Sequence, residues 1–598
     1  MENEKSLKLL KVCAVVCVAA GVLSLVIFIP QVRELIINFG EKYVGRPLTR
    51  EVWHGRFIGW ELAFLLTLVL PIMIFSSLAF NVRFLSERLP LFRKLHFDRK
   101  YIVAVALCFA FISGIRFYWM SRKTGFHEDE LWGIGICNFN DMDKDGTGFW
   151  GSLPEKDRAY SGFEIKEKVF FNNPSVLDML KDEVRLWVNN RDSPHPSLYY
   201  MLFRLWFVGA KTHDFRHIFI RGILLNYVFF CVSFLLMLHL LGMLRAGKVE
   251  SVFLLLMAFC NPASIGISIF LRTYALQETG LILFSAVFVR YLGLFASGTS
   301  EFDRVFFLKT AFATAVTMST GYFTIMFVGL AGLVMIINRS RVKDWNSIRY
   351  FLLVFVAALL ISRLFYLNFG LGLFVGRGTE ALSKLNHGVV KSLGNAVINT
   401  ISIISRNFIS FYALLAVFVS NIVLCALSKK KGVSTDGVGI LLFFLAFAWV
   451  LVTIFFAPYK TLRYVAPVFC LFPAIFIPCA RTNRASWAAL GLQIAVTAFV
   501  CARTLPLERN AVNIEHIDDS NKSAANPEYN KHPDVPVFIQ RGCVRAYIYP
   551  YLNDSQTYYF IDDEAELSQY QQSDYYYLEF LEGDGVLIEK RHKAEGIE

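Results

Sequence analysis

Three consecutive carboxylates, Glu128, Asp129 and Glu130, lie in the stretch HEDELWG, almost directly after an apolar run of membrane-spanning length. Like charges this close repel one another unless a cation or a metal ion pairs with them. A carboxylate held at such a place can take a proton from a hydroxyl group or bind a metal ion. Asp129 and Glu130 are therefore the candidate catalytic residues. A solvated acidic loop that caps a helix is the alternative.

Basic side chains stand out at three later places. His195 lies between two prolines in DSPHPSLYY, Arg272 lies between apolar runs in LRTYAL, and Lys460 and Arg463 lie in PYKTLRYVAP. A buried cation beside a membrane is costly, so we expect it to face a cavity or a partner. Arginine and lysine suit a phosphate or pyrophosphate ligand. The alternatives are a structural histidine and long side chains that reach the membrane interface.

The stretch NDMDKDGTGFW contains half of a calcium-binding loop. Asp141, Asp143 and Asp145, followed by Gly146, match the first half of the EF-hand pattern. Ser152 occupies the position where that pattern has a bidentate glutamate. The sequence therefore leaves two interpretations open: a site for a divalent cation (calcium, magnesium or manganese), or a plain acidic turn.

The composition determines the class of protein. Of the 598 residues, 55% are hydrophobic and only 18% are charged, against about 25% charged in soluble proteins. This excludes a soluble globular protein, a disordered chain and a small disulfide-stapled domain. The formal charge of +12 falls in short runs between apolar segments, which indicates orientation in a membrane rather than binding to nucleic acid.

Apolar runs divide the chain into about 13 membrane-spanning helices of about 20 residues each. They lie near residues 10–29, 57–80, 101–120, 218–243, 251–270, 273–295, 305–321, 322–337, 350–369, 401–427, 438–457, 463–480 and 485–502. With basic linkers in the cytoplasm, three polar pieces fall outside: 121–217, 370–400 and 503–598. The predicted domains are N-terminal spans in 1–120, an extracytoplasmic catalytic loop in 121–217, a helix bundle in 218–502 and a C-terminal domain in 503–598.

The two larger outer pieces have their own secondary-structure patterns. In the first, apolar residues at helical spacing after Ser175 predict an amphipathic helix on the membrane surface, with Ser175 and Asp178 as an N-cap pair. A helix packed inside the outer domain is the alternative. Residues 197–210 predict a second surface or re-entrant helix. In the tail, short alternating runs predict a small α/β domain. Its expected strands are Val535–Gln540, Ala546–Tyr549, Thr557–Ile561, Tyr575–Phe580 and Val586–Lys590.

In this order along the chain, the four stretches resemble the GT-C superfamily of polytopic glycosyltransferases, in the branch of protein mannosyltransferases and aminoarabinose transferases. The family pattern is an Asp-Glu pair in the first outer loop, a Pro-flanked His before Leu-Tyr-Tyr, an Arg-x-Tyr, and an Arg-Tyr near a late span. The matching stretches are Asp129-Glu130, His195 to Tyr200, Arg272-Thr273-Tyr274 and Arg463-Tyr464. Two spans precede the span that leads to the Asp-Glu pair, where the family usually has one before it, and Ser197 replaces a second proline.

The resemblance implies transfer of a sugar from a polyprenyl-phosphate donor to a lipid, glycan or protein acceptor on the outer face of a membrane. Because the chain is compact and the resemblance leans to bacterial members, we expect a bacterial inner membrane. Asp129 would act as general base, and His195, Arg272, Tyr274, Lys460 and Arg463 would bind the donor phosphate. Two other classes stay open. One is a transporter or a flippase of lipid-linked glycans, and the other is a membrane scaffold that binds through its tail.

Overall fold

The computed structural model describes two compact units of the chain, residues 1–108 and residues 109–598. The first unit contributes residues near 32–39 and the beginning of helix α5 (Arg99–Arg122). The second unit holds the other described elements. The described residues are 32, 34, 35, 37–39, 99–123, 126–137, 158–169, 175–190, 192, 195–210, 212, 214–296, 304–370, 389–430, 436–457, 460–480, 483–504, 528–540, 551–562, 564–570, 574–581 and 586–592.

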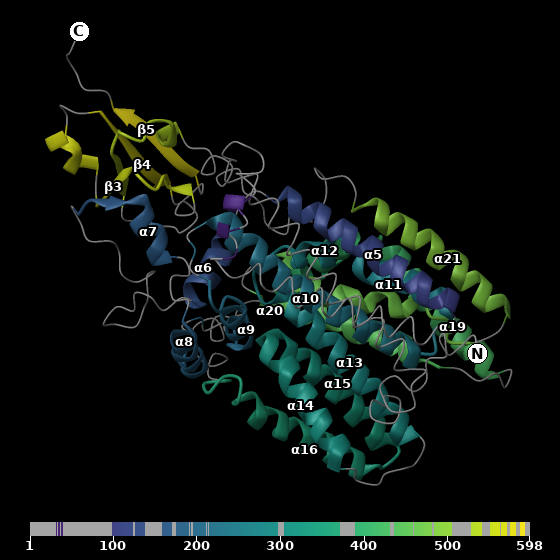
Figure 1. The fold of residues 1–598 in the computed structure, drawn as a ribbon. Coiled ribbons are helices and arrows are strands. Elements are labelled where there is room, and N and C mark those ends of the chain that lie inside the picture. The colour runs from purple at the N-terminus through teal and green to yellow at the C-terminus, as the bar shows by residue number, and fades with distance from the viewer. Residues whose placement is uncertain are drawn as a thin grey trace. The chain divides into compact units, whose positions relative to one another are not determined.

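The chain is a helical membrane protein. Within the described residues, eight helices are long and apolar enough to cross a membrane (Figure 1). They are α5, α10 (Phe215–Met243), α13 (Tyr274–Ala296), α15 (Tyr322–Arg341), α16 (Trp345–Ser362), α19 (Phe411–Lys430), α20 (Val438–Phe456) and α21 (Asn483–Ala502). The predicted spans at 10–29 and 57–80 lie outside the described residues.

One further predicted span, 251–270, is a broken helix. Helix α11 (Lys248–Phe259) and helix α12 (Pro262–Ser268) meet at an angle of 61°. Asn261 stabilises this break. Its side chain accepts a hydrogen bond from the N–H of Ser264 and donates to two carbonyls at the end of α11. Proline at the first position of α12 lacks the N–H that would continue α11.

Three predicted spans differ in length or boundary. Helix α14 (Arg304–Thr320) has 17 residues, and the run at 401–427 is divided between α18 (Val389–Asn407) and α19. The run at 463–480 forms two 3-10 helices, η4 (Leu462–Tyr464) and η5 (Ala466–Phe476). Pro467 and Pro473 remove backbone donors there, and every residue of η5 is buried. The apolar character of η5 therefore reflects burial within the bundle.

Four short helices lie between α5 and α10: α6 (Glu128–Cys137), α7 (Gly162–Val169), α8 (Val176–Val188) and α9 (Leu198–Trp206). The amphipathic helix predicted after Ser175 is confirmed as α8. The Ser175 hydroxyl accepts a hydrogen bond of 3.0 Å from the N–H of Asp178, as the N-cap prediction required.

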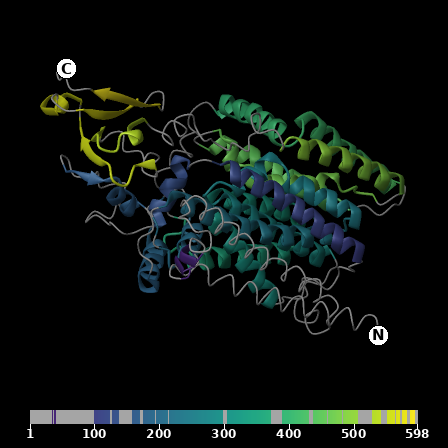
Figure 2. The ribbon, with the colours of Figure 1, turned by 45° about the horizontal axis from the view of Figure 1, so that its top comes forward.

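A five-stranded sheet, in the order β1-β3-β2-β4-β5, contains strands from two distant parts of the chain. Its centre, β2 (Val537–Gln540), runs parallel to β3 (Thr557–Ile561) and β4 (Tyr575–Leu581), and β5 (Val586–His592) is antiparallel to β4. These four strands lie where the tail pattern predicts them, and the predicted strand 546–549 lies outside the described residues. The edge strand β1 (Tyr160–Ser161) comes from the loop before α7 and pairs with β3 (Figure 2). The same part of the chain contains two short 3-10 helices, η7 (Glu528–Lys531) and η10 (Glu564–Tyr570).

Candidate active site

Helix α6 begins with a reciprocal pair of hydrogen bonds that aims its first carboxylates. The Glu130 carboxylate accepts a hydrogen bond of 2.6 Å from the N–H of His127, and Nδ1 of His127 accepts one of 3.0 Å from the N–H of Asp129. This arrangement resembles a capping box in which an imidazole replaces the usual hydroxyl. It turns Glu130 toward the protein and leaves Asp129 on the other side of the helix start.

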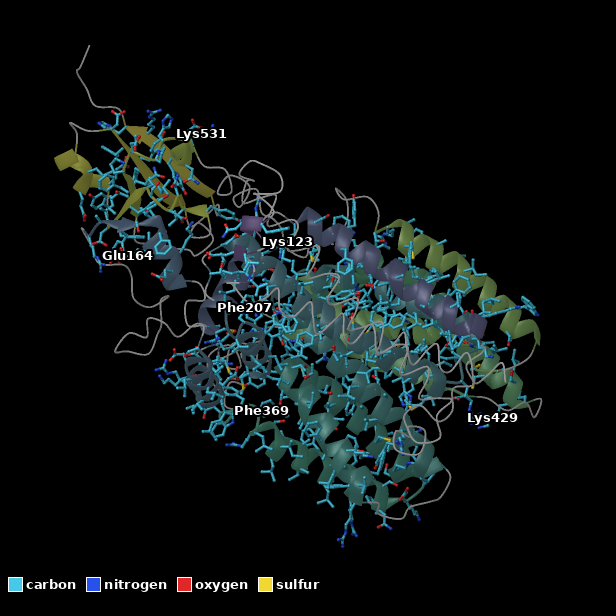
Figure 3. All side chains as sticks on the ribbon, in the orientation of Figure 1. Lys123, Glu164, Phe207, Phe369, Lys429 and Lys531 are labelled. Carbon is cyan, nitrogen blue, oxygen red and sulfur yellow. The ribbon has the colours of Figure 1, made fainter. Side chains whose placement is uncertain are left out.

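Glu130 is fully buried and surrounded by donors. Besides His127, it accepts hydrogen bonds from the ammonium of Lys123 and from the N–H of Leu271, the latter at 2.7 Å. Lys123 lies just after α5 (Figure 3) and also donates to the carbonyl of Ile269 at 2.7 Å. We call Lys123, Glu130 and the backbone of Ile269 and Leu271 the anchor cluster. It ties α5 and α6 to the turn before α13.

Asp129 has the opposite surroundings. Its carboxylate forms an ion pair with Arg463 of η4, lies 3.8 Å from Nδ1 of His127, and keeps a third of its side-chain surface exposed. Burial raises the pKa of this carboxyl, but the positive charges of Arg272 and Arg463 outweigh that effect and hold the pKa below its ordinary value. Asp129 is therefore ionised at neutral pH, accessible and beside cations.

Sequence reasoning missed Asp192, which is central to the site. Its buried Oδ2 lies 3.0 Å from Nδ1 of His195, and it accepts hydrogen bonds from the hydroxyl of Tyr200 at 2.5 Å and from Arg272 at 3.2 Å. Burial raises the pKa of Asp192, but His195 and Arg272 outweigh it and hold the pKa well below its ordinary value. The spacing from Asp192 to His195, within one turn, was the available signal.

Arg272 connects these carboxylates. It donates to Asp192, its charge acts on Asp129, and its guanidinium packs against Gly133 of α6, where a Cβ would lie 3.5 Å from Nη1. Its Nε and Nη1 atoms are buried and have no hydrogen-bond partner among the described residues. We call Asp129, Asp192, His195, Arg272 and Arg463 the charged cluster. It draws on α6, the turn before α9, the turn before α13, and η4.

A second ionic network holds the broken helix that leads to Arg272. Arg116 of α5 is buried and donates to the carbonyls of Phe259 and Ser264 and, at 2.9 Å, to the hydroxyl of Ser264. The Ser264 hydroxyl in turn donates to Glu278 of α13 at 2.6 Å. The carbonyl of Phe259, at the end of α11, thereby gains a donor inside the membrane-spanning region. This network fixes the position at which the chain turns toward Arg272.

The other two predicted phosphate ligands are Tyr274 and Lys460. The ring of Tyr274 stacks on Phe270 and meets the ring of Tyr464 edge-on, with centroids 5.9 and 6.3 Å away. The ammonium of Lys460 donates to the carbonyls of Ile454, Phe455 and Ala457. Lys460 therefore caps the end of α20.

His127 is a second residue that sequence reasoning did not assign. Because the N–H of Asp129 donates to its Nδ1, the proton of the neutral ring lies on Nε2. Burial, with help from Arg463 and Lys123, lowers the pKa of His127 to about 4 against the opposing charge of Asp129. The ring is therefore neutral at pH 7 and holds the Asp129 backbone in place.

The metal prediction is untested. Among the described residues, no group of three or more His, Cys, Asp or Glu side chains could hold a metal ion. Asp141, Asp143 and Asp145 of the half calcium loop lie outside the described residues. A divalent cation at that loop stays a prediction.

Comparisons with protein-family models, with curated proteins and with solved structures found no match to this chain.

Proposed function

We propose that the chain is a membrane glycosyltransferase that moves a sugar from a polyprenyl-phosphate donor to a lipid, glycan or protein acceptor. Asp129 is the general base, and Arg272 and Arg463 bind the donor phosphate with His195 beside them. The resemblance to GT-C glycosyltransferases suggested these roles. The charged cluster supports them, because it unites side chains that are as far apart in the sequence as residues 129 and 463.

The ion pair between Asp129 and Arg463 is the observation that supports this proposal most strongly. It joins an accessible carboxylate to a cation from a different segment, with Arg272 close enough to act on the same carboxylate. A donor with a polyprenyl tail keeps the tail in lipid, so its phosphate must stop near the membrane surface. Cations beside a base are the groups that such a donor and a hydroxyl acceptor require.

The same ion pair implies an exchange of partners. Without donor, Arg463 neutralises Asp129 and lowers its basicity. The donor phosphate is a diester with one negative charge, and it gains a second when the bond to the sugar breaks. It competes for the guanidinium, because a bidentate arginine–phosphate contact is strong. When Arg463 turns to the phosphate, Asp129 loses a cation, its pKa rises, and it becomes a better base.

The proposed step is a direct displacement. The acceptor oxygen forms a bond to the anomeric carbon while the bond from that carbon to the phosphate oxygen breaks. The acceptor proton goes to Asp129, and the electron pair leaves with the polyprenyl phosphate, which Arg272 and Arg463 stabilise. A single displacement inverts the anomeric centre.

The test is turnover of the purified full-length protein in lipid nanodiscs. Radiolabelled polyprenyl-phosphate sugars are supplied with membrane-lipid or glycan extracts, and labelled product is separated from donor. We expect product with the native chain and a fall of about 100- to 10,000-fold for Asp129→Asn.

Asp534→Asn is the matched control, since Asp534 is exposed in the turn before β2. It makes the same chemical change and should leave turnover unaltered. Full turnover by Asp129→Asn would remove Asp129 from its role. Absence of transfer from every donor tested, by a monodisperse native protein, would contradict the transferase itself.

The finer parts of the architecture belong to the same proposal. They are about 13 spans in all, a GT-C-like arrangement, and a tail that folds as a small α/β domain on the extracytoplasmic side together with the catalytic loop. The proposed location is a bacterial inner membrane with the site facing the periplasm. Attachment of a membrane-impermeant label to a cysteine introduced at Asp534 in sealed, oriented vesicles tests the side of the tail.

A transporter or flippase of lipid-linked glycans is the second candidate, and the Arg116–Ser264–Glu278 network favours it. Ionisable residues buried in spanning helices often lie on a transport path. Reconstituted vesicles loaded with a fluorescent lipid-linked sugar distinguish the two. Movement of the intact lipid across the bilayer without cleavage of the sugar–phosphate bond would support transport.

A further inference from the structure

Helix α8 carries an apolar face that the described residues leave uncovered. Its members recur at helical spacing, and between 41% and 70% of each residue is exposed. They are Val176, Leu177, Leu180, Val184 and Val188. A contiguous apolar face of this kind on a short helix requires a partner or a lipid surface.

The opposite face of α8 is already packed. Met179, Asp182 and Leu186 are buried, and Asp182 forms an ion pair of 2.7 Å with Nε of Arg204 in α9. Arg204 is itself buried. This buried pair fixes the rotation of α8 about its axis, because any other rotation would leave a charge without its partner. The apolar face is therefore held outward.

Three hydrogen bonds join the end of α8 to the chain that follows α16. The N–H of Leu367 donates to the carbonyl of Trp187 at 2.8 Å, and the side-chain amide of Asn368 donates to the carbonyl of Val188 at 2.7 Å. The indole N–H of Trp187 donates to the carbonyl of Arg363 at 3.0 Å. Phe369, labelled in Figure 3, marks this junction. Helix α8 thus lies at the end of a candidate membrane span.

The exposed surface of α16 continues into this junction. Leu352, Val356, Leu360 and Leu364 follow one another at four-residue spacing, and each is about half exposed or more. On a spanning helix such a stripe faces lipid. Leu367, also exposed, extends the stripe to the residues bonded to α8. The same lipid that covers α16 therefore reaches α8.

Polar groups around the face fit the same surroundings. Lys181 and Arg185 lie along one edge of the apolar face and are about half exposed or more, as suits contact with phosphate headgroups. Trp187 lies at the junction, where indole rings commonly mark the membrane interface. Burial raises the pKa of Glu183, at the other edge, to about 8, so its carboxyl is neutral at pH 7.

We propose that α8 is an interfacial helix whose apolar face inserts into the lipid bilayer beside the end of α16, with Lys181 and Arg185 directed to the headgroups. The occupant of this face is lipid, and neither a second copy nor another segment of the chain. The proposal does not depend on the transferase activity.

Photocrosslinking in lipid tests it directly. The photoreactive residue p-benzoylphenylalanine replaces Leu177, Leu180 or Val184 in separate full-length variants, and the exposed Asp534 in the control. Each is reconstituted in vesicles of phosphatidylethanolamine and phosphatidylglycerol and irradiated. The mass of the intact protein then reports any attached phospholipid. We expect several-fold more lipid adduct at the apolar positions than at Asp534.

Three variants keep the test independent of any one that fails to fold, since only monodisperse protein is irradiated. A crosslink to another part of this chain, or a dimer, would show that protein covers the face and would overturn the proposal. Equal lipid attachment at Leu180 and Asp534 would overturn it as well.

Discussion

The anchor cluster and the charged cluster contain adjacent carboxylates in contrasting surroundings. Glu130 has no exposed surface and accepts hydrogen bonds from Lys123, His127 and Leu271. Asp129 is one-third exposed and pairs with Arg463. A carboxylate whose acceptor sites are filled from within the protein holds structure together. One that faces solvent and pairs with a cation from a distant segment can exchange that partner for a ligand.

The largest effect should come from Glu130→Ala. The change leaves the buried ammonium of Lys123 without its counter-charge, and breaking a buried pair in this way costs about 3–5 kcal/mol of the free energy of unfolding. Thermal denaturation in detergent measures it. Glu528→Ala is the control, since its pair with Lys531 is exposed and is worth less than about 1 kcal/mol. Equal losses of unfolding free energy in Glu130→Ala and Glu528→Ala would show that the buried pair is worth no more than the exposed one, and would contradict the structural role of Glu130.

The next effect is a dependence of stability on pH that arises from His127. Its pKa of about 4 in the folded protein lies below the ordinary value of 6.5, so the unfolded state binds more protons between these values. The contribution of His127 to the free energy of unfolding is fully present well above pH 6.5. It is lost as the pH drops toward 4, by about 2.5 kcal/mol at pH 4.5. His127→Asn keeps a hydrogen-bond acceptor for Asp129 but does not titrate. A variant as acid-sensitive as the native chain would contradict this assignment.

Arg463→Ala should raise the KM for the donor by about 10- to 100-fold, the value of one charge-assisted hydrogen bond. Arg463→Lys should recover only part of that loss, because an ammonium cannot form the bidentate contact. Steady-state kinetics with varied donor measures both. Arg216→Ala, at an exposed position at the start of α10, is the control. An unchanged KM in Arg463→Ala would remove this residue from the donor site.

The smallest effect should come from Lys460→Ala. Because Lys460 caps α20, its loss should cost about 0.5–1 kcal/mol of stability and leave the donor KM unaltered. Kinetics and thermal denaturation on the same sample separate the two outcomes. A rise in KM as large as that of Arg463→Ala would return Lys460 to the phosphate site.

Local patterns predicted local structure well. The N-cap at Ser175, the helix that follows it and strands β2 to β5 lie where hydrophobic spacing and turn residues place them. Strand β1 was not predicted. Its two residues, Tyr160 and Ser161, are too few to show an alternating hydrophobic pattern, and they form a strand by pairing with β3. The run at 463–480 was predicted as a membrane span but forms two 3-10 helices. Hydropathy alone does not distinguish a segment that contacts lipid from one that is buried among helices.

The candidate site shows the same limit. Residue type suggested Asp129, His195, Arg272 and Arg463, but it could not show that Asp129 and Glu130 have different surroundings, since both follow the same span. That difference depends on Leu271, whose backbone N–H donates to Glu130 from 141 residues away. Asp192 was missed, and the contacts of Lys460 were not foreseen, because residue type and spacing do not give their partners. These are Arg272 for Asp192, and carbonyls at the end of α20 for Lys460.

The exchange of Arg463 from Asp129 to the donor phosphate is the claim on which the mechanism depends. Single-turnover kinetics of Asp129→Asn over a range of donor concentrations test it in one measurement, since they report both donor affinity and the rate of transfer. With Asp129 uncharged, Arg463 no longer has to give up its ion pair with that residue. We therefore expect tighter donor binding than in the native chain together with a transfer rate about 100- to 10,000-fold lower. Weaker donor binding, or a transfer rate close to native, would contradict it.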